Sequence, residues 1–293
     1  MAKSVFKGSG VALVTPFTKD GVDYQKLDEL IEFQIQAGTD AIIITGTTGE
    51  ASVMPDEEQI DVIRHTVETV NHRIAVIAGC GSNDTSHGAQ LSAMAEAAGA
   101  DGLLSVTPYY NKTTQKGLIE HYSYIAKAVS VPVILYNVPG RTGMNMTPAT
   151  VASIMDRCDN VVGVKECNFD QVGDIFNLCG PDVSVYSGED GLVVPLMSLG
   201  GSGVISVLAN VAPKAVSTMV HACLDGNYAK AAEIQIGALP LIKALFCETS
   251  PIPVKAAMNM MGMNVGECRM PLTSMEESNR VVLEAAMKGY GLL

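Results

Sequence analysis

The chain contains no tryptophan, and aromatic residues make up only 5% of its 293 residues. A large core must therefore rest on aliphatic side chains, for which the 47% hydrophobic content is sufficient. Its five histidines never show His-x-x-x-His spacing, and its seven cysteines include no Cys-x-x-Cys pair. We therefore expect no structural zinc site, no histidine-based metal site and no disulfide framework. An odd number of unpaired cysteines is typical of reduced thiols in a cytoplasmic protein.

Positive charge is also scarce, and the formal net charge is −12. This excess of negative charge disfavours nucleic acid and anionic membranes as partners, although a site can still be locally positive and bind a small anion. Residues 1–10 lack the apolar core of a signal peptide. The uncharged stretch 191–213 is long enough for a membrane span. However, Pro195 and the glycines at 200, 201 and 203 instead indicate a short helix, a glycine turn and a strand.

Short apolar runs alternate along the chain with longer amphipathic segments. The runs read as buried parallel strands at 11–14, 41–44, 74–77, 102–106, 133–136, 161–165, 183–186 and 204–207. Helical patterns cover 24–37, 56–70, 84–98, 115–129, 148–157 and 213–224. Eight strands alternating with helices predict an α/β fold, a (β/α)8 TIM barrel over residues 1–224. Residues 225–293, with helical patterns at 228–246, 252–261 and 274–288, are predicted to form a C-terminal helical extension.

Lys165 ends the uncharged run 160–164. An amine at the end of a buried strand is desolvated, which lowers its pKa and leaves a neutral nucleophile. Such a lysine can form a Schiff base with a carbonyl compound. Glu166 is a poor partner because neighbouring strand residues point to opposite faces. The alternative is a structural lysine that reaches solvent or pairs with a distant carboxylate.

Polar residues follow several of the predicted strands at their carboxyl ends. These ends meet at one mouth of such a barrel, where active sites lie. The segment 45–50 contains Thr47 and Thr48 between glycines, so its hydroxyls and amides could hold a carboxylate. It could equally be an ordinary glycine turn. The segments 107–111 and 187–190 reach the same mouth and contain Tyr110 and Gly188.

Tyr136 and Arg141 belong to a further segment at this mouth, 136–142. Tyr136 could relay a proton to the amine, or it could simply be a packed tyrosine. Arg141 follows a Pro-Gly turn and could bind a carboxylate with both guanidinium nitrogens, or it could be solvated. Glu189 and Asp190 are a possible acid–base pair, although two carboxylates on a loop are more often solvated.

Three motifs together identify a resemblance that covers essentially the whole chain: Gly-Thr-Thr-Gly-Glu at 46–50, Tyr-Asn-Val-Pro-Gly-Arg-Thr at 136–142 and Val-Lys-Glu at 164–166. The chain resembles the pyruvate-dependent class I aldolase superfamily and, within it, the dihydrodipicolinate synthase family. This resemblance implies a lyase that condenses pyruvate with L-aspartate 4-semialdehyde to 4-hydroxy-tetrahydrodipicolinate, the first committed step toward diaminopimelate and lysine. It implies no metal or organic cofactor, and a homo-oligomer that is typically a tetramer.

The resemblance also implies roles for residues. Lys165 corresponds to the lysine that forms the imine with pyruvate. Thr47, Tyr110 and Tyr136 correspond to a proton-relay triad, with Tyr110 reaching into a neighbouring subunit's site. Among the substrate-binding positions, the resemblance places Thr48 at the pyruvate carboxylate and Arg141 at the carboxylate of the semialdehyde. Gly188 and Ile205 line the pocket.

Two rival functions and one departure from the family remain. Sialic-acid and keto-deoxy sugar aldolases share the barrel, lysine and tyrosine but generally lack an arginine at the position of Arg141. A non-catalytic pyruvate-binding barrel is the second rival. Lysine-inhibited members carry histidines at the positions of Asp56 and Gln59 and an acidic residue at that of His87, while Asn83 and Tyr109 are kept here. We therefore expect weak or no inhibition by lysine.

Overall fold

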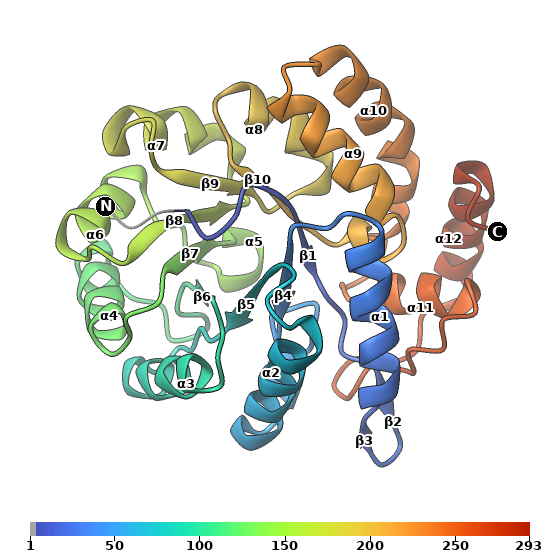
Figure 1. Ribbon diagram of the computed structural model, residues 1–293, viewed down its shortest axis with the longest axis horizontal. Coiled ribbons are helices and arrows are strands. Elements are labelled where there is room, and N and C mark those ends of the chain that lie inside the picture. Colours follow the sequence, from blue (N-terminus) through green and yellow to red (C-terminus); the bar gives the residue numbers. More distant parts are fainter. Residues whose placement is uncertain (1–3) are drawn as a thin grey trace.

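Eight parallel strands form a closed barrel in the computed structural model, which describes residues 4–293. The strands neighbour one another in the order β1-β10-β9-β8-β7-β6-β5-β4, so the predicted barrel is confirmed (Figure 1). Their bounds are β1 (Gly8–Ala12), β4 (Ala41–Ile44), β5 (Ala75–Gly79), β6 (Gly102–Val106), β7 (Val133–Asn137), β8 (Val161–Glu166), β9 (Ser184–Ser187) and β10 (Gly203–Ser206).

An outer ring of helices covers the strands (Figure 1). It consists of α1 (Tyr24–Gln36), α2 (Asp56–Val70), α3 (Thr85–Ala97), α4 (Gln115–Lys127), α6 (Pro148–Arg157), α7 (Val172–Cys179), α8 (Val193–Ser198) and α9 (Pro213–Leu224). Side-chain caps define several starts, because the side chains of Asp23, Asp84 and Thr147 accept hydrogen bonds from first-turn amides. The sequence did not predict α7 or the small hairpin of β2 (Phe17–Thr18) and β3 (Gly21–Val22).

Three further helices stand outside the ring on one side of the barrel, coloured orange to red in Figure 1. They are α10 (Tyr228–Ala244), α11 (Ile252–Met260) and α12 (Glu277–Tyr290), as the helical pattern of the tail predicts. The helix α10 packs on α8 and α9, and α12 packs on α10 and α11. The division into a barrel of residues 1–224 and an extension of residues 225–293 stays an interpretation.

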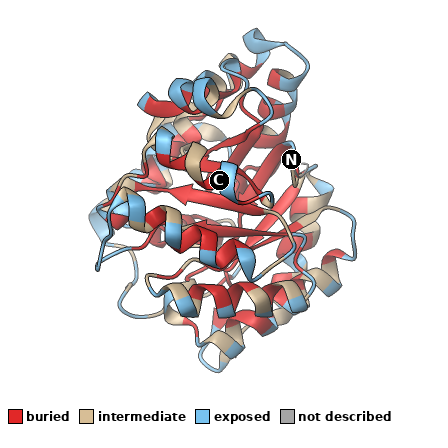
Figure 2. Ribbon diagram, turned by 90° about the vertical axis from the view of Figure 1, so that its left-hand side faces the viewer, coloured by how far each residue is buried: buried red, intermediate tan, exposed pale blue. Residues whose placement is uncertain are grey.

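Buried residues form two layers, one inside the barrel and one between strands and helices. Figure 2 shows the strands as almost entirely buried and the outward helix faces as exposed. Inside the barrel, Phe6 stacks on Tyr186 with ring centroids 4.5 Å apart, and the Tyr186 hydroxyl donates to the Phe6 carbonyl. This aromatic pair fills the interior near the start of β1. The remaining interior includes Tyr136 and Ile205, so the inner layer extends toward the carboxyl ends of the strands.

Residues 191–213 fold as predicted, into the short helix α8, a glycine turn and the strand β10. No helix in the described part of the chain has the length and apolar character needed to cross a lipid bilayer.

Candidate active site

A bulge in β8 determines which way the side chain of Lys165 points. Val133 of β7 pairs with Val161, but the next residue, Ile134, pairs with Gly163, so β8 has one extra residue at Val162. Val162 packs in the interior, and strict alternation from there would turn Lys165 outward. The bulge reverses this phase and brings Lys165 into the barrel. A Cβ atom on Gly163 would lie 1.9 Å from the Ser184 carbonyl oxygen, so the close approach requires glycine.

Lys165 is buried without a charged partner. Its side chain is 6% exposed, and it makes no hydrogen bond or ion pair with any of residues 4–293. Burial lowers the pKa of Lys165, and the charge of Arg141 lowers it further, whereas Cys167, Asp190 and Glu189 raise it. The ammonium position lies 4.3 Å from the centroid of the Tyr136 ring, a contact that favours the charged form by about 0.5–2 kcal/mol. Burial prevails, which favours the neutral, nucleophilic amine.

Tyr136 faces Lys165 from the neighbouring strand, since the two residues are register partners of β7 and β8. The tyrosine is also buried, and this burial raises the pKa of its phenol well above the usual range. The phenol therefore keeps its proton at neutral pH. A protonated hydroxyl beside a neutral amine is a suitable pair for passing a proton to or from a carbonyl substrate.

A buried hydrogen-bond network around Glu166 connects the carboxyl ends of β7 and β8. Glu166 accepts hydrogen bonds from the Asn137 side chain at 2.8 Å, the Asn168 amide at 2.7 Å and the Gln171 side chain at 2.8 Å. Asn137 is its register partner, one residue beyond the Tyr136–Lys165 pair. Burial raises the pKa of Glu166 to about 7 despite these donors. This network was not predicted from the sequence, and it fixes the strand ends that present Tyr136 and Lys165.

The predicted glycine turn at 45–50 follows β4. Thr48 is buried, whereas the Thr47 side chain is exposed and forms no hydrogen bond within residues 4–293. The Thr15 hydroxyl donates to the Gly49 carbonyl at 2.7 Å and so holds the turn against the loop after β1. Thr45 and Glu50 both have positive φ angles, 52° and 59°, so this loop is held in a backbone conformation that side chains disfavour.

Arg141 lies on a short helix, α5 (Pro139–Thr142), and not on the simple Pro-Gly turn that the sequence predicts. Its Nη2 donates to the Ser250 carbonyl at 3.2 Å, so the C-terminal extension contacts this side chain. Arg141 is otherwise exposed, which leaves guanidinium donors free for a carboxylate.

Gly188 and Ile205 lie beside the lysine and the interior tyrosine. A Cβ atom on Gly188 would be 3.3 Å from Cε of Lys165 and 2.3 Å from Sγ of Cys167. Ile205 is 1% exposed and packs in the interior cluster that contains Tyr136. Cys167 was not predicted at the site, although strand alternation from Lys165 would have placed it there. Burial raises the pKa of its thiol to about 12, so it remains protonated.

Asp190 differs from the loop carboxylate that the sequence predicts. It is buried and accepts hydrogen bonds from the Ser206 hydroxyl and from the amides of Val207 and Leu208. These contacts fix the end of β10, which indicates a structural role. Glu189 is only partly buried, and burial and the neighbouring Asp190 raise its pKa.

Tyr110 is not buried against the other site residues within one chain. Its side chain is 92% exposed and forms no hydrogen bond with residues 4–293, and its φ angle is 68°. Residues 4–293 also contain no group of three or more His, Cys, Asp and Glu side chains suited to a metal ion.

Comparisons with known proteins agree with the resemblance. Residues 5–289 match the model of the dihydrodipicolinate synthetase family. The 4-hydroxy-tetrahydrodipicolinate synthase of Acetivibrio thermocellus is 60% identical over 293 residues, which cover 100% of each chain. The enzyme of the same name from Thermoanaerobacter pseudethanolicus is 55% identical over 291 residues, covering 99% of this chain and 98% of the relative.

Solved structures give the same answer. The crystal structure of dihydrodipicolinate synthase from Aquifex aeolicus matches with a TM-score of 0.96 at 45% identity, covering 98% of this chain and 99% of that one. The enzyme from Cyanidioschyzon merolae, crystallised with lysine bound, matches with a TM-score of 0.96 at 39% identity, covering 99% and 100%. With a family model that matches nearly its whole length and a relative 60% identical from end to end, the chain belongs to the dihydrodipicolinate synthetase family.

Proposed function

We propose that this chain is a lyase that condenses pyruvate with L-aspartate 4-semialdehyde to 4-hydroxy-tetrahydrodipicolinate through a Schiff base on Lys165. The observation that carries the chemistry is the buried amine of Lys165 over the Tyr136 ring at the mouth of the barrel, with no hydrogen-bond or ion-pair partner among residues 4–293. The product is the first committed intermediate of the diaminopimelate and lysine pathway, which is a cytoplasmic process.

The reaction begins at the neutral amine of Lys165, which attacks the ketone carbon of pyruvate. Two proton transfers release the ketone oxygen as water and leave an iminium. The iminium nitrogen takes up the electron pair when the methyl carbon loses a proton, so an enamine forms without any metal or organic cofactor. The enamine carbon attacks the aldehyde of the semialdehyde, and that substrate's own amine then displaces Lys165 and closes the ring.

The proton transfers are assigned to Tyr136, oriented by Thr47 and by Tyr110 of a second subunit. General acid–base assistance of this kind typically contributes about 10²–10⁴-fold. Thr48, with the amides of its loop, holds the pyruvate carboxylate. Arg141 binds the carboxylate of the semialdehyde, and Gly188 and Ile205 shape the pocket around the imine. Gly188 suits this role, because a side chain there would collide with Cys167 and crowd Lys165.

The overall activity is tested by a coupled assay with pyruvate and L-aspartate 4-semialdehyde. Borohydride added with pyruvate should attach a reduced pyruvate to Lys165, as seen by peptide mass spectrometry. Replacing the semialdehyde with N-acetylmannosamine or another sugar aldehyde tests the rival aldolase function, and turnover of only those aldehydes would reject the proposal. Pyruvate binding without turnover of any aldehyde would indicate a non-catalytic barrel.

The exposed Tyr110 supports a homo-oligomer in which each site receives this residue from a neighbour. Leu199, at the end of α8, and Ile236, on α10, are also exposed apolar residues, and we assign the tetramer that the resemblance implies. Mixing inactive Lys165→Met chains with Tyr110→Phe chains tests the sharing of sites. Hybrid oligomers contain sites with an intact Lys165 and an intact partner Tyr110, so activity should exceed the sum of the two variants. Sedimentation equilibrium decides between tetramer and dimer.

Weak inhibition by lysine is the regulatory part of the proposal. Asp56 and His87 pair with each other at 2.9 Å. The Gln59 side chain donates to the carbonyls of Ala51 and Met54, both at 3.0 Å. These groups are thus already partnered at the positions where lysine-inhibited relatives are expected to differ. Lysine titration of the assay should change the rate little, with the Cyanidioschyzon merolae enzyme as the positive control for binding. Half-inhibition at sub-millimolar lysine would contradict this.

A further inference from the structure

Glu50 is the last residue of the predicted carboxylate-binding loop, and its carboxylate forms a buried ion pair. Its side chain is 1% exposed and that of its partner, Lys255, is 2% exposed. The pair joins the loop after β4 to the helix α11 of the C-terminal extension. Two buried charges are costly to remove from water, so a pair of this kind is retained only where its geometry is good.

The geometry of the pair is complete. The ammonium of Lys255 donates to Oε1 of Glu50 at 2.9 Å, to the Glu267 carbonyl at 2.9 Å and to the Thr15 carbonyl at 3.1 Å. These three contacts use all three of its donors. The other carboxylate oxygen of Glu50 accepts the Arg269 amide at 2.8 Å. One charge pair therefore ties together the loops after β1 and β4, the helix α11 and the segment 266–269.

A ring of side chains surrounds this junction. The ammonium of Lys255 lies 4.6 Å and the guanidinium carbon of Arg269 lies 4.0 Å from the centroid of the Phe17 ring. Arg269 also forms an ion pair with Glu58 of α2 through both of its terminal nitrogens. These contacts hold the segment 266–269 against the barrel and so fix the surroundings of the Lys255–Glu50 ion pair.

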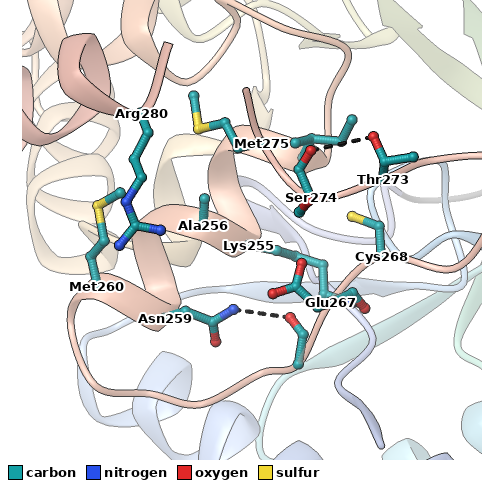
Figure 3. Close-up of a pocket in the computed structure, with 12 residues that line it drawn as sticks. Lys255, Ala256, Asn259, Met260, Glu267, Cys268, Thr273, Ser274, Met275 and Arg280 are labelled. Carbon is teal, nitrogen blue, oxygen red and sulfur yellow. Dashed lines mark hydrogen bonds between the residues drawn. The ribbon is translucent and has the colours of Figure 1, made fainter. Parts of the chain in front are cut away.

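A pocket of about 170 Å³ lies on the outer side of the same junction. Figure 3 shows Lys255 leaving α11 close to Glu267, with Cys268 next along the same segment and Asn259 bonded to the segment 266–269. The pocket borders the junction from the side of the extension. Glu50, at the end of the carboxylate-binding loop, reaches the junction from the side of the barrel.

Besides the Glu50 side chain, the loop is held by the hydrogen bond from the Thr15 hydroxyl to the Gly49 carbonyl at 2.7 Å and by hydrogen bonds of its own backbone. The amide of Glu50 donates to the Thr47 carbonyl at 3.1 Å, and the following amide, of Ala51, donates to the Gly46 carbonyl at 3.4 Å. The positive φ angles of Thr45 and Glu50 are unfavourable for residues with a side chain, so intrinsic backbone preference does not stabilise this loop conformation. The Glu50 carboxylate, bonded to Lys255 and to the Arg269 amide, therefore anchors the end of the loop that contains Thr47 and Thr48.

We propose that Glu50 and Lys255 are positioning residues for the loop that binds pyruvate, so that the C-terminal extension sets pyruvate affinity from behind the site. This proposal rests on the proposed function for its substrate, but not for the loop anchoring itself. The extension thus has a second role beside its contact to Arg141.

The test compares Glu50→Gln, the double variant Glu50→Gln with Lys255→Met, and a matched control pair. The double variant leaves no unpaired buried charge, so it keeps the fold even where a single substitution does not. The control, Glu284→Gln with Lys288→Met, removes an exposed pair from α12 in the same extension. Measurements are KM for each substrate, kcat, and hydrogen exchange of the amides at 46–50.

Both Glu50 variants should raise KM for pyruvate about tenfold, change kcat less than about threefold, and leave KM for the semialdehyde as in the wild type. Exchange at 46–50 should accelerate, while the control matches the wild type in every measurement. A double variant with wild-type KM for pyruvate and wild-type exchange overturns the proposal, even if its melting temperature falls. If the wild type itself shows no turnover and no trapped imine, the proposed function fails, and the exchange rates alone still decide whether Glu50 anchors the loop.

Discussion

Two lysines are buried among residues 4–293, one at the mouth of the barrel and one at the junction with the C-terminal extension, and their surroundings differ. Lys165 is 6% exposed and has no hydrogen-bond acceptor or carboxylate bonded to it within the described chain. Lys255 is 2% exposed and donates to a carboxylate and two carbonyls. Burial alone therefore does not make an amine nucleophilic. The missing partner matters as well, because burial without a bonded carboxylate lowers the pKa of Lys165 and favours its neutral form.

Exchanging either lysine for methionine should give the largest effects and the sharpest contrast. Lys165→Met should abolish trapping of pyruvate and lower kcat at least about 10³-fold, because the nucleophile is lost. Its stability should not fall, since an unpaired amine is replaced by an apolar chain of similar length. Lys255→Met should instead lower the free energy of unfolding by about 3–5 kcal/mol, because Glu50 is left buried without its partner.

Urea denaturation and borohydride trapping on the same preparations measure both halves of this contrast. A Lys165→Met chain that unfolds as easily as Lys255→Met would show that Lys165 also has a structural partner. Retained full activity in Lys165→Met would remove it from the mechanism.

Gly163→Ala tests whether the bulge in β8 is what makes Lys165 the inward lysine. The added methyl group would lie 1.9 Å from the Ser184 carbonyl oxygen, so the strands must separate or the bulge must move. Displacing a nucleophile by about 1 Å can cost about 10²-fold in rate, and we expect a loss of this size in kcat. Gly173→Ala is the control, since a Cβ atom there meets nothing within 4 Å. Equal kcat values for the two variants would show that the bulge is dispensable.

The two lysines also differ in what the sequence reveals. Lys165 could be found because its evidence is local: an uncharged, β-branched run that ends in one amine. The barrel could be predicted for the same reason, since the alternation of apolar and amphipathic segments repeats along the chain. The short helices α5 and α7 were missed, because four and eight residues give little helical periodicity.

Lys255 and the bulge could not be found this way. Glu50 and Lys255 are 205 positions apart, and no local pattern connects them. The register shift at Val162 depends on how β7 and β8 meet, which alternation within one strand does not encode. Cys167 is the intermediate case, because its spacing of two from Lys165 was sufficient to place it on the same face.

Arg141→Met should have a smaller effect and separate the two substrates. Loss of a carboxylate contact of about 1.5–3 kcal/mol corresponds to a rise of about 10- to 150-fold in KM for L-aspartate 4-semialdehyde. Trapping of pyruvate on Lys165 should persist, because Arg141 is assigned to the second substrate. Arg157→Met, which removes an exposed pair with Glu120 on the outer helices, is the control. A selective rise in KM for pyruvate would instead assign Arg141 to the first carboxylate.

The titration of Lys165 should give the smallest effect, a pH dependence of stability and of imine formation that distinguishes Lys165 from Lys255. Its pKa in the folded chain lies below the ordinary lysine value of 10.5, so between these two values the unfolded chain binds more protons than the folded one. Stability must then rise with pH across this window, by up to about 1.4 kcal/mol for each unit that separates the two pKa values. In Lys165→Met this rise disappears, so the advantage of the variant in urea should be greatest at neutral pH and shrink toward pH 10.5.

The rate of imine formation in the wild type should increase with pH through the same folded pKa and then level off, because only the neutral amine attacks. Arg141→Met should move that limb to higher pH, since the guanidinium lowers the pKa of Lys165. A wild-type limb that levels off only near 10.5 would mean that burial leaves Lys165 an ordinary cation, and the distinction between the two buried lysines would then be one of position alone.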